Sequence, residues 1–127
     1  MTNKSPIDNV QNSKQYDLEE RTFQFSKKVA FFIKKLPKSI SNIEYGRQVI
    51  RSSGSVGSNY IEANEALGKK DFMMRIRICL KEAKESSYWL RLIVETNEEE
   101  LIDEGLQLFK EATELKKIFS SILAKSK

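Results

Sequence analysis

Histidine is missing from the 127-residue sequence, which also has only one cysteine, two prolines and five glycines. Without histidine, the chain lacks the commonest general base and the commonest metal ligand. Phosphate-binding loops, dinucleotide fingerprints and zinc-ligand spacings are absent from the sequence as well. We therefore expect a protein that is not an enzyme and that holds no metal or other cofactor.

The single cysteine, Cys79, excludes an intramolecular disulfide and fits a reducing compartment. No hydrophobic run approaches the roughly 18 residues of a membrane-spanning helix. Residues 1–15 are polar and lack the apolar core of a signal peptide. These absences predict a cytoplasmic protein, with a disordered N-terminal tail over residues 1–15 and one folded domain over residues 16–127.

Apolar residues recur at helical spacing in four segments, and the scarcity of glycine and proline also favours long helices. The intervals alternate mostly between four and three residues, as in a helix with one buried seam. Short connections then force consecutive helices to run antiparallel. The sequence predicts an all-α fold, an antiparallel up-down-up-down four-helix bundle. The four seams are Leu18, Thr22, Phe25, Val29, Phe32, Leu36; Val49, Ser53, Val56, Tyr60, Ala63, Leu67; Phe72, Ile76, Cys79, Ala83, Ser86, Leu90, Ile93; and Leu101, Leu108, Ala112, Leu115, Phe119, Ile122.

The second predicted helix, from about Ile43 to Leu67, contains a serine- and glycine-rich run over Ser52–Asn59. Locally this run is typical of a loop, because each glycine inside a helix costs about 1 kcal/mol relative to alanine. The apolar period nevertheless continues across the run, and small side chains allow a neighbouring helix to approach. We expect a continuous helix, with Ser41 or Asn42 as its N-cap and Gly68 as its C-cap, rather than an open loop.

A polar row lies along one face of this helix at intervals of four, four and three residues, and consists of Arg51, Ser55, Asn59 and Glu62. Because an unpaired charge near the core is costly, we expect the arginine and the glutamate to pair. We interpret the row as a network that sets helix register or a subunit contact; a row of ligand-contacting residues is the alternative. Cys79 lies on a seam and is interpreted as a core residue rather than a nucleophile.

Charge is distributed unevenly along the chain. Residues 21–91 contain 15 basic and 6 acidic residues, whereas residues 92–127 contain 5 and 8. A basic centre favours polyanionic partners, although lysine-rich helices are also common for solubility alone. The residues that we expect to bind nucleic acid are Lys27, Lys28, Lys34, Lys35, Lys38, Arg47, Arg75, Arg77, Lys81 and Lys84.

Two segments carry a family resemblance. Residues 51–64 read RSSGSVGSNYIEAN, and residues 70–90 read KDFMMRIRICLKEAKESSYWL. They resemble the 23S ribosomal RNA intervening-sequence protein family, whose first segment reads Arg-Ser/Ala-x-x-Ser-Val-x-x-Asn-Ile-x-Glu and whose second has Asp-Phe followed by Leu, Ala and Ser. The similarity extends over residues 16–125. The matching positions are Arg51, Ser55, Asn59, Glu62, Asp71, Phe72, Leu80, Ala83 and Ser86.

The resemblance implies a four-helix bundle that often assembles as a ring-shaped homopentamer. It also implies kinship with the accessory variability protein of diversity-generating retroelements, a basic pentamer that binds nucleic acid. The chain departs from the family at Tyr60, where an aliphatic residue is usual, and at residues 63–66, where many members have a glycine after the glutamate. These departures leave the expected fold intact.

Two functions follow from these features. The first is a non-enzymatic oligomer that binds RNA or DNA through its basic surface, largely without sequence specificity. The second is a protein-interaction scaffold whose basic face meets an acidic partner such as a reverse transcriptase. Self-association is expected in either case, because four apolar residues lie off the seams. These residues are Phe23, Phe31, Ile78 and Tyr88.

Overall fold

Four long helices make up most of the structure. The structure is a computed structural model and describes residues 13–126, with side chains described from Asp17 onward. Its first helix begins inside the segment predicted as a tail, whose residues 1–12 lie outside the described part. The elements are α1 (Ser13–Lys35), α2 (Ile40–Asn64), α3 (Lys69–Glu95), the short 3-10 helix η2 (Glu99–Leu101) and α4 (Ile102–Lys125).

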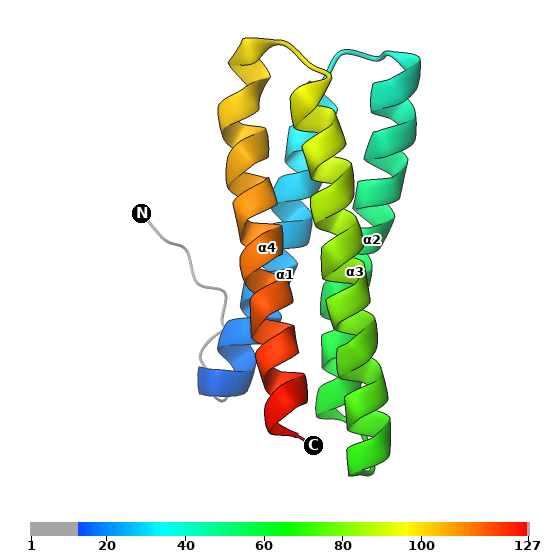
Figure 1. The fold of residues 1–127 in the computed structure, drawn as a ribbon, viewed down its shortest axis with the longest axis vertical. Coiled ribbons are helices and arrows are strands. Elements are labelled where there is room, and N and C mark those ends of the chain that lie inside the picture. The colour runs from blue at the N-terminus through cyan, green and yellow to red at the C-terminus, as the bar shows by residue number, and fades with distance from the viewer. Residues whose placement is uncertain (1–12, 127) are drawn as a thin grey trace, which may run out of the picture.

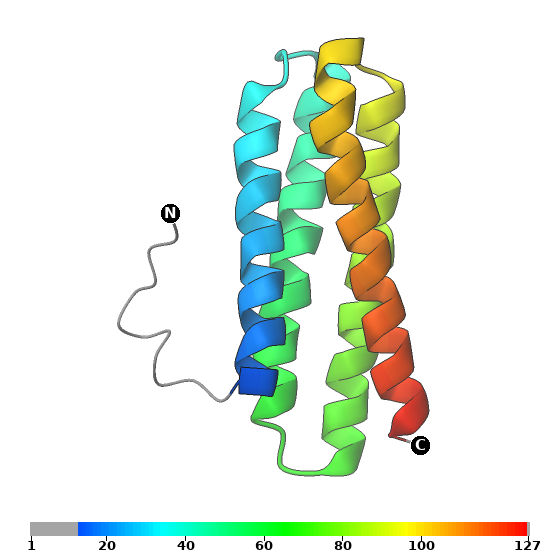
Figure 2. The same ribbon diagram turned by 90° about the vertical axis from the view of Figure 1, so that its left-hand side faces the viewer.

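Consecutive helices run antiparallel. The links α1–α2 and α3–α4 lie at one end of the molecule, and the link α2–α3 lies at the other (Figures 1 and 2). Because these links are short, each helix packs beside the one before it. Residues 13–126 contain no strand. The predicted all-α, antiparallel four-helix bundle is confirmed.

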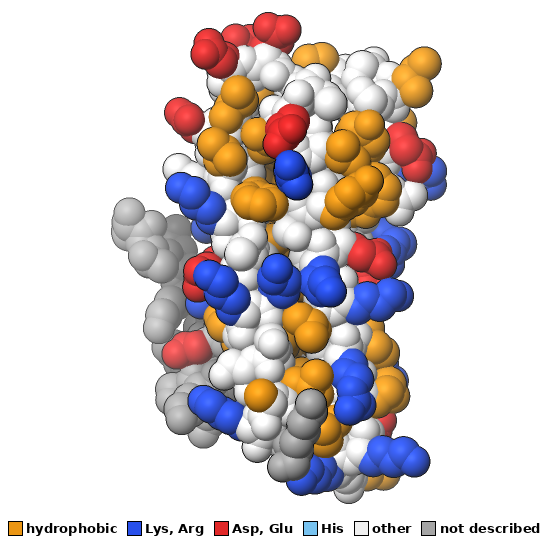
Figure 3. Space-filling model, viewed as in Figure 1, with side chains coloured by type: hydrophobic (Ala, Val, Ile, Leu, Met, Phe, Trp, Pro, Cys, Tyr) orange, Lys and Arg blue, Asp and Glu red, His pale blue; other side chains and the backbone are white. Residues whose placement is uncertain are grey.

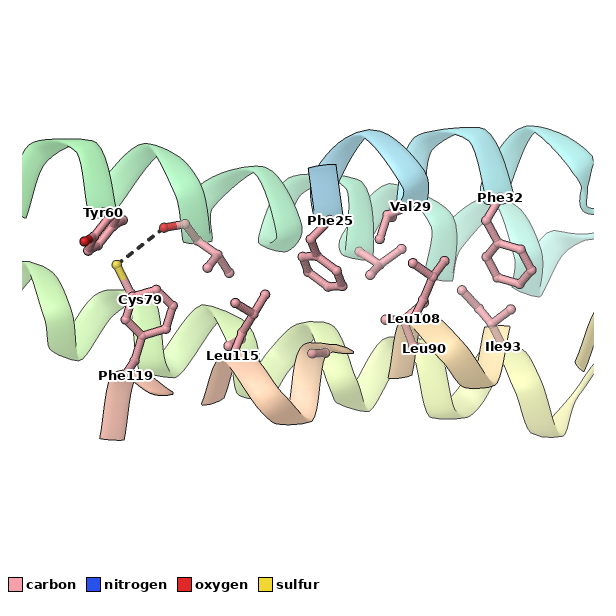
Figure 4. Packing of buried hydrophobic residues seen from close by; sticks show 14 of the residues in the cluster. Phe25, Val29, Phe32, Tyr60, Cys79, Leu90, Ile93, Leu108, Leu115 and Phe119 are labelled. Atoms are coloured by element: carbon pink, nitrogen blue, oxygen red, sulfur yellow. Dashed lines mark hydrogen bonds between the residues drawn. The ribbon is translucent and has the colours of Figure 1, made fainter. Parts of the chain in front are cut away.

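The core is built from the predicted seams, whose side chains point toward one another between the helices (Figure 4). The seam residues near the ends of the bundle, such as Leu18 and Phe72, are only half-buried. Leu67 is the exception, because it is 102% exposed. The largest fully buried core side chains are Phe25, Phe32, Phe119, Ile76, Leu90, Ile93 and Leu115.

The serine- and glycine-rich run of α2 is helical throughout, as predicted. Ser52 is completely buried, and its hydroxyl lies 2.8 Å from the hydroxyl of Ser86 on α3. A Cβ at Gly57 would lie 3.0 Å from the Oγ1 atom of Thr22 on α1. The small residues therefore bring α2 close to both of its neighbours, and this close packing offsets the low helix propensity of the run.

The predicted ends of α2 are wrong by a few residues. The helix begins earlier than expected, because Ser39 is its N-cap and the Ser39 hydroxyl accepts a hydrogen bond from the Asn42 amide at 3.1 Å. It ends at Asn64, so Leu67 follows the apolar period but lies beyond the helix. Gly68 precedes α3 in an extended conformation, with φ −159°, and does not terminate α2 in a left-handed one.

Candidate functional site

A groove with basic walls lies between α3 and α4, and we call it the basic groove. The space-filling view shows basic side chains gathered in a band across the middle of this face (Figure 3). The volume of the basic groove is about 520 Å³. A neighbouring hollow on α3 continues it and shares Leu80 and Lys84 with it. The residues that line the groove and its continuation are Arg77, Leu80, Lys81, Lys84, Glu85, Lys116, Lys117, Ser120, Ser121 and Ala124.

The helical period places the α3 cations on one side. Arg77, Lys81 and Lys84 are separated by four and three residues, so they form one stripe along the outside of the helix. The buried residues Cys79 and Ala83 occupy the opposite side, which faces the core. The fold thus turns the cations of α3 outward and holds Lys84 beside Lys116 and Lys117 of α4.

The charge of the basic groove is only weakly offset. Lys117 lies 3.8 Å from Glu114, and Lys81 lies 4.0 Å from Glu85. Both are exposed pairs within one helix, and such pairs contribute about 0.3–0.5 kcal/mol. Within residues 13–126, Arg77, Lys84 and Lys116 take part in no ion pair. The groove therefore presents net positive charge to solvent.

The predicted lysines of α1 lie elsewhere, and acidic residues of α4 meet some of them. Lys35 pairs with Glu104 at 3.0 Å. Lys28 lines a separate groove between α1 and α4, together with Glu104 and Glu111. In that groove Arg21 donates two hydrogen bonds to Glu111, at 2.7 and 2.8 Å, and these bonds raise the pKa of the Arg21 guanidinium. This side of the bundle is electrostatically mixed.

A third group of predicted cations surrounds an apolar groove between the end of α1 and the start of α2. Lys34, Lys38 and Arg47 line this groove together with alanine, proline and isoleucine side chains. Arg47 is paired with Glu44 at 2.7 Å. Hydrogen bonds from Gln48 and then from Arg47 hold the pKa of that carboxyl below its ordinary value.

The ten predicted nucleic-acid-binding residues are therefore divided among several surfaces. Arg77, Lys81 and Lys84 lie together at the basic groove. Lys27 is exposed on α1. Arg75 is half-buried, and its Nη1 donates a hydrogen bond to the Oδ1 atom of Asn59 at 2.9 Å. The structure assigns Arg75 to the contact between α2 and α3.

Lys116 and Lys117 are the residues of the basic groove that sequence reasoning missed. They lie in the segment from residue 92 onward, whose net charge is negative, so counting charges by region hid them. The available signal was their position on the outward side of the predicted fourth helix, beside the seam residue Leu115. Their closeness to Lys84 depends on how α3 and α4 pack, and this packing could not be predicted from the sequence.

The polar row of α2 contacts α3. Arg51 pairs with Glu82 at 3.3 Å and with Glu85 at 3.0 Å. The expected pairing with Glu62 is wrong, because eleven residues of helix separate the two by about 16 Å. Asn59 donates to the carbonyl and hydroxyl oxygens of Ser55 at 2.9 and 3.0 Å.

Glu82 is 5% exposed, so its charge requires the arginine partner that it has. Glu62, at the other end of the row, is exposed to solvent. The contacts of Arg51, Ser55 and Asn59 favour the interpretation of the row as a network that fixes the register of α2 on α3.

Chemically reactive groups are scarce among the described residues. Cys79 is fully buried, and its thiol donates a hydrogen bond to the Val56 carbonyl oxygen at 3.4 Å (Figure 4). Burial raises the pKa of this thiol to about 12, so it stays protonated at neutral pH. Residues 13–126 contain no group of three metal-binding side chains. In the same part of the chain, no helix combines the length and the hydrophobicity that crossing a bilayer requires.

Comparisons with known proteins place this bundle in a family. A solved structure from Bacteroides thetaiotaomicron, described as a protein of unknown function from the S23 ribosomal protein family, is 28% identical and superposes with a TM-score of 0.75. The match covers 87% of this chain and 98% of that one. A comparison with curated proteins found no match. The model of the 23S rRNA-intervening sequence protein family matches residues 14–121, and the chain belongs to that family.

Proposed function

We propose that the protein is a non-enzymatic, oligomeric module that binds nucleic acid, RNA or DNA, through the basic groove. The observation that supports this most is the meeting of Lys84 from α3 with Lys116 and Lys117 from α4 around one hollow. The hydroxyls of Ser120 and Ser121 lie in the same hollow and can donate hydrogen bonds to phosphate oxygens.

The chemistry of the groove favours contacts with the phosphate backbone. Lysine presents a flexible point charge and lacks the fixed fork with which arginine reads guanine. Neutralisation of phosphates releases counterions, so affinity should fall steeply as salt rises. We therefore expect binding that is strongly salt-dependent and largely independent of base sequence.

The double variant Lys116→Glu/Lys117→Glu, which reverses the charges of two adjacent lysines of α4, tests this function. The variant is expected to bind structured RNA and duplex DNA at least about tenfold more weakly at low salt, because two attractive charges become repulsive. For the duplex, each lost phosphate contact should reduce the slope of log K against log salt by about 0.9. Fluorescence anisotropy titrations at about 50, 100 and 200 mM salt measure both quantities.

Lys27→Glu/Lys28→Glu is the matched control, because it makes the same change at two adjacent, exposed lysines of α1 outside the basic groove. It alters net charge equally, so it should weaken binding much less if the groove is the site. Equal losses in the two variants would assign the effect to overall charge and overturn the groove as the site. Absence of binding by the unaltered protein at low salt would overturn the function itself.

We also propose that copies of the chain associate through the apolar groove between α1 and α2. Two large apolar side chains on this side are exposed, Ile43 at 57% and Ile50 at 46%. Ile43 and Ile50 both line the groove, whose volume is about 470 Å³. Covering such side chains contributes about 25 cal/mol for each Å² removed from water. Repetition of the basic groove around an oligomer would raise affinity by multivalency.

The double variant Ile43→Glu/Ile50→Glu is expected to lower the mass in solution to that of the 14.7 kDa monomer, because it places charges in the proposed contact. Light scattering after size-exclusion chromatography measures this mass. The unaltered protein should give five times the monomer mass if it forms the pentamer expected from the family resemblance. Ile61→Glu, at a similarly exposed position outside the groove, is the control. A monomeric unaltered protein, or an oligomer that persists in the double variant, would contradict the assignment.

A further inference from the structure

An exposed aromatic residue continues the cationic stripe of α3. Arg77, Lys81, Lys84 and Tyr88 follow one another at intervals of four, three and four residues, so all four project from the same side of the helix. Tyr88 is 59% exposed. From Arg77 to Tyr88 the stripe extends about 16 Å along the helix. Three cations in a line thus lead to a ring that lies mostly in solvent.

The ring of Tyr88 packs against that of its neighbour Trp89. Its ring centroid lies 5.1 Å from that of Trp89, in an edge-to-face arrangement with the planes at 76°. Trp89 is half-buried and packs in turn against Tyr45 of α2, with centroids 6.0 Å apart. An exposed ring that is already ordered loses little rotational freedom when it binds a flat partner.

We propose that the ligand of the basic groove is a single strand of nucleic acid, with its phosphates along Arg77, Lys81 and Lys84 and one base stacked on Tyr88. This inference rests on the proposed function and specifies its ligand class. In a duplex, both faces of each internal base are covered by neighbouring bases, so a duplex can meet the cations but cannot offer a base to the ring. In a single strand the base faces are available, and stacking on aromatic side chains adds to the phosphate contacts.

The cations and the ring have separable effects on binding. Phosphate contacts determine the salt dependence, whereas stacking on an uncharged ring adds affinity that salt does not remove. A stacking role also tolerates any flat aromatic side chain at position 88 and requires no hydroxyl. These two properties distinguish stacking from a general contribution of the surface.

The test compares a short, unstructured, uridine-rich RNA strand with the duplex formed from that strand and its complement. Tyr88→Ala is expected to weaken binding of the single strand about 5- to 100-fold and to leave its salt slope unchanged. Binding of the duplex should change by less than about twofold, because no phosphate contact is lost. Tyr88→Phe should bind both probes as the unaltered protein does, since the ring is retained.

Four outcomes would overturn the inference. These are equal losses by Tyr88→Ala on strand and duplex, no loss on either, a loss in Tyr88→Phe as large as in Tyr88→Ala, and a change of mass in solution in Tyr88→Ala. The last would assign the ring to a contact between copies of the chain. If the unaltered protein bound neither probe at low salt, the proposed function would fail as a whole. Binding of the duplex as tight as that of the strand, with no effect of Tyr88→Ala, would overturn this inference and leave the proposed function standing.

Discussion

Replacing Phe32 with alanine is expected to lower the free energy of unfolding by about 3–5 kcal/mol. The ring is completely buried near Ile93, at the end of the core where α1 packs against α4 (Figure 4). Its Cζ atom lies 3.0 Å from where a Cβ on Gly105 would be, so α4 is already as close as it can come. The variant therefore loses apolar burial and keeps a cavity. Urea unfolding followed by circular dichroism measures the change.

The neighbouring phenylalanine provides a control. Phe31 is 49% exposed and stacks only loosely under Lys34, whose ammonium lies 5.4 Å from the ring centroid. Phe31→Ala removes the same atoms one position away and is expected to cost less than about 1 kcal/mol. A similar loss of stability in both variants would mean that Phe32 is not the buried residue of the pair.

Gly105→Ala gives a second check on the same contact. In the unaltered protein alanine gains about 1 kcal/mol of helix propensity, but its methyl group would lie 2.7 Å from the stiff Val94 side chain and 3.0 Å from Phe32. Overpacking of this kind costs about 1–3 kcal/mol, so destabilisation is expected. In the Phe32→Ala background the contact with the ring is gone and only the one with Val94 remains, so the destabilisation should be smaller. Equal effects in the two backgrounds would show that Phe32 and Gly105 are not in contact.

The core could be predicted from the sequence because the seam is a one-dimensional pattern. A side chain three or four residues from the last buried one returns to the same side of the helix, so Phe25, Val29 and Phe32 were identifiable without any knowledge of their partners. The period also continued across Ser52–Asn59 and outweighed the low helix propensity of that run. Close packing between helices stabilises the small side chains there, and local helix propensity does not include this contribution.

The helix ends could not be predicted so well. Leu67 continues the period, but nothing in the period says where the chain leaves the helix. The end of α2 is held from outside, because the side chain of Asn64 donates a hydrogen bond to Glu19 of α1 at 2.8 Å. Gly68 allows both left-handed and extended conformations, and only the direction of the following helix decides between them.

The candidate site required distances between helices. Sequence reasoning grouped the cations by their positions along the chain. In the bundle these cations lie on different surfaces, because the helices that carry them face different directions. The sequence offered both Lys35 and Lys84 as candidates for binding nucleic acid. Lys35, however, pairs with Glu104 of α4, sixty-nine positions away in the sequence. Arg51 likewise has its partners on α3 and none on its own helix. Pairings of this kind depend on which helices are neighbours, and the heptad pattern alone leaves that open.

Asn42→Asp is expected to destabilise the protein by about 2–4 kcal/mol, which is the second large effect. Asn42 is 5% exposed, and its amide nitrogen donates to the Pro37 carbonyl at 2.9 Å and to the Asn97 side-chain oxygen at 2.8 Å. Asn97 returns a hydrogen bond of 2.8 Å and uses its remaining proton on the Ile93 carbonyl at 2.9 Å. The two asparagines thus join the α1–α2 link to the α3–α4 link in one closed network.

An aspartate at position 42 breaks this network in a specific way. One carboxylate oxygen still accepts from Asn97, but the other faces two oxygens and has no proton to offer. Asn97 cannot turn its amide to help, because it would then lose the bond to Ile93. The loss should be measurable by urea unfolding at neutral pH, where the carboxyl is ionised.

Asn59→Asp is the matched control, because it makes the same change in the same helix beside a cation. There the Nη1 of Arg75 already donates to the Asn59 side-chain oxygen at 2.9 Å, so an introduced carboxylate gains an ion pair as it loses the two bonds donated to Ser55. We expect a change of less than about 1 kcal/mol at this position. The difference between the two variants measures what surrounds each new charge: two carbonyl oxygens at one site and a guanidinium at the other. Equal stability of the two variants would mean that the asparagine network between the links contributes nothing to the fold.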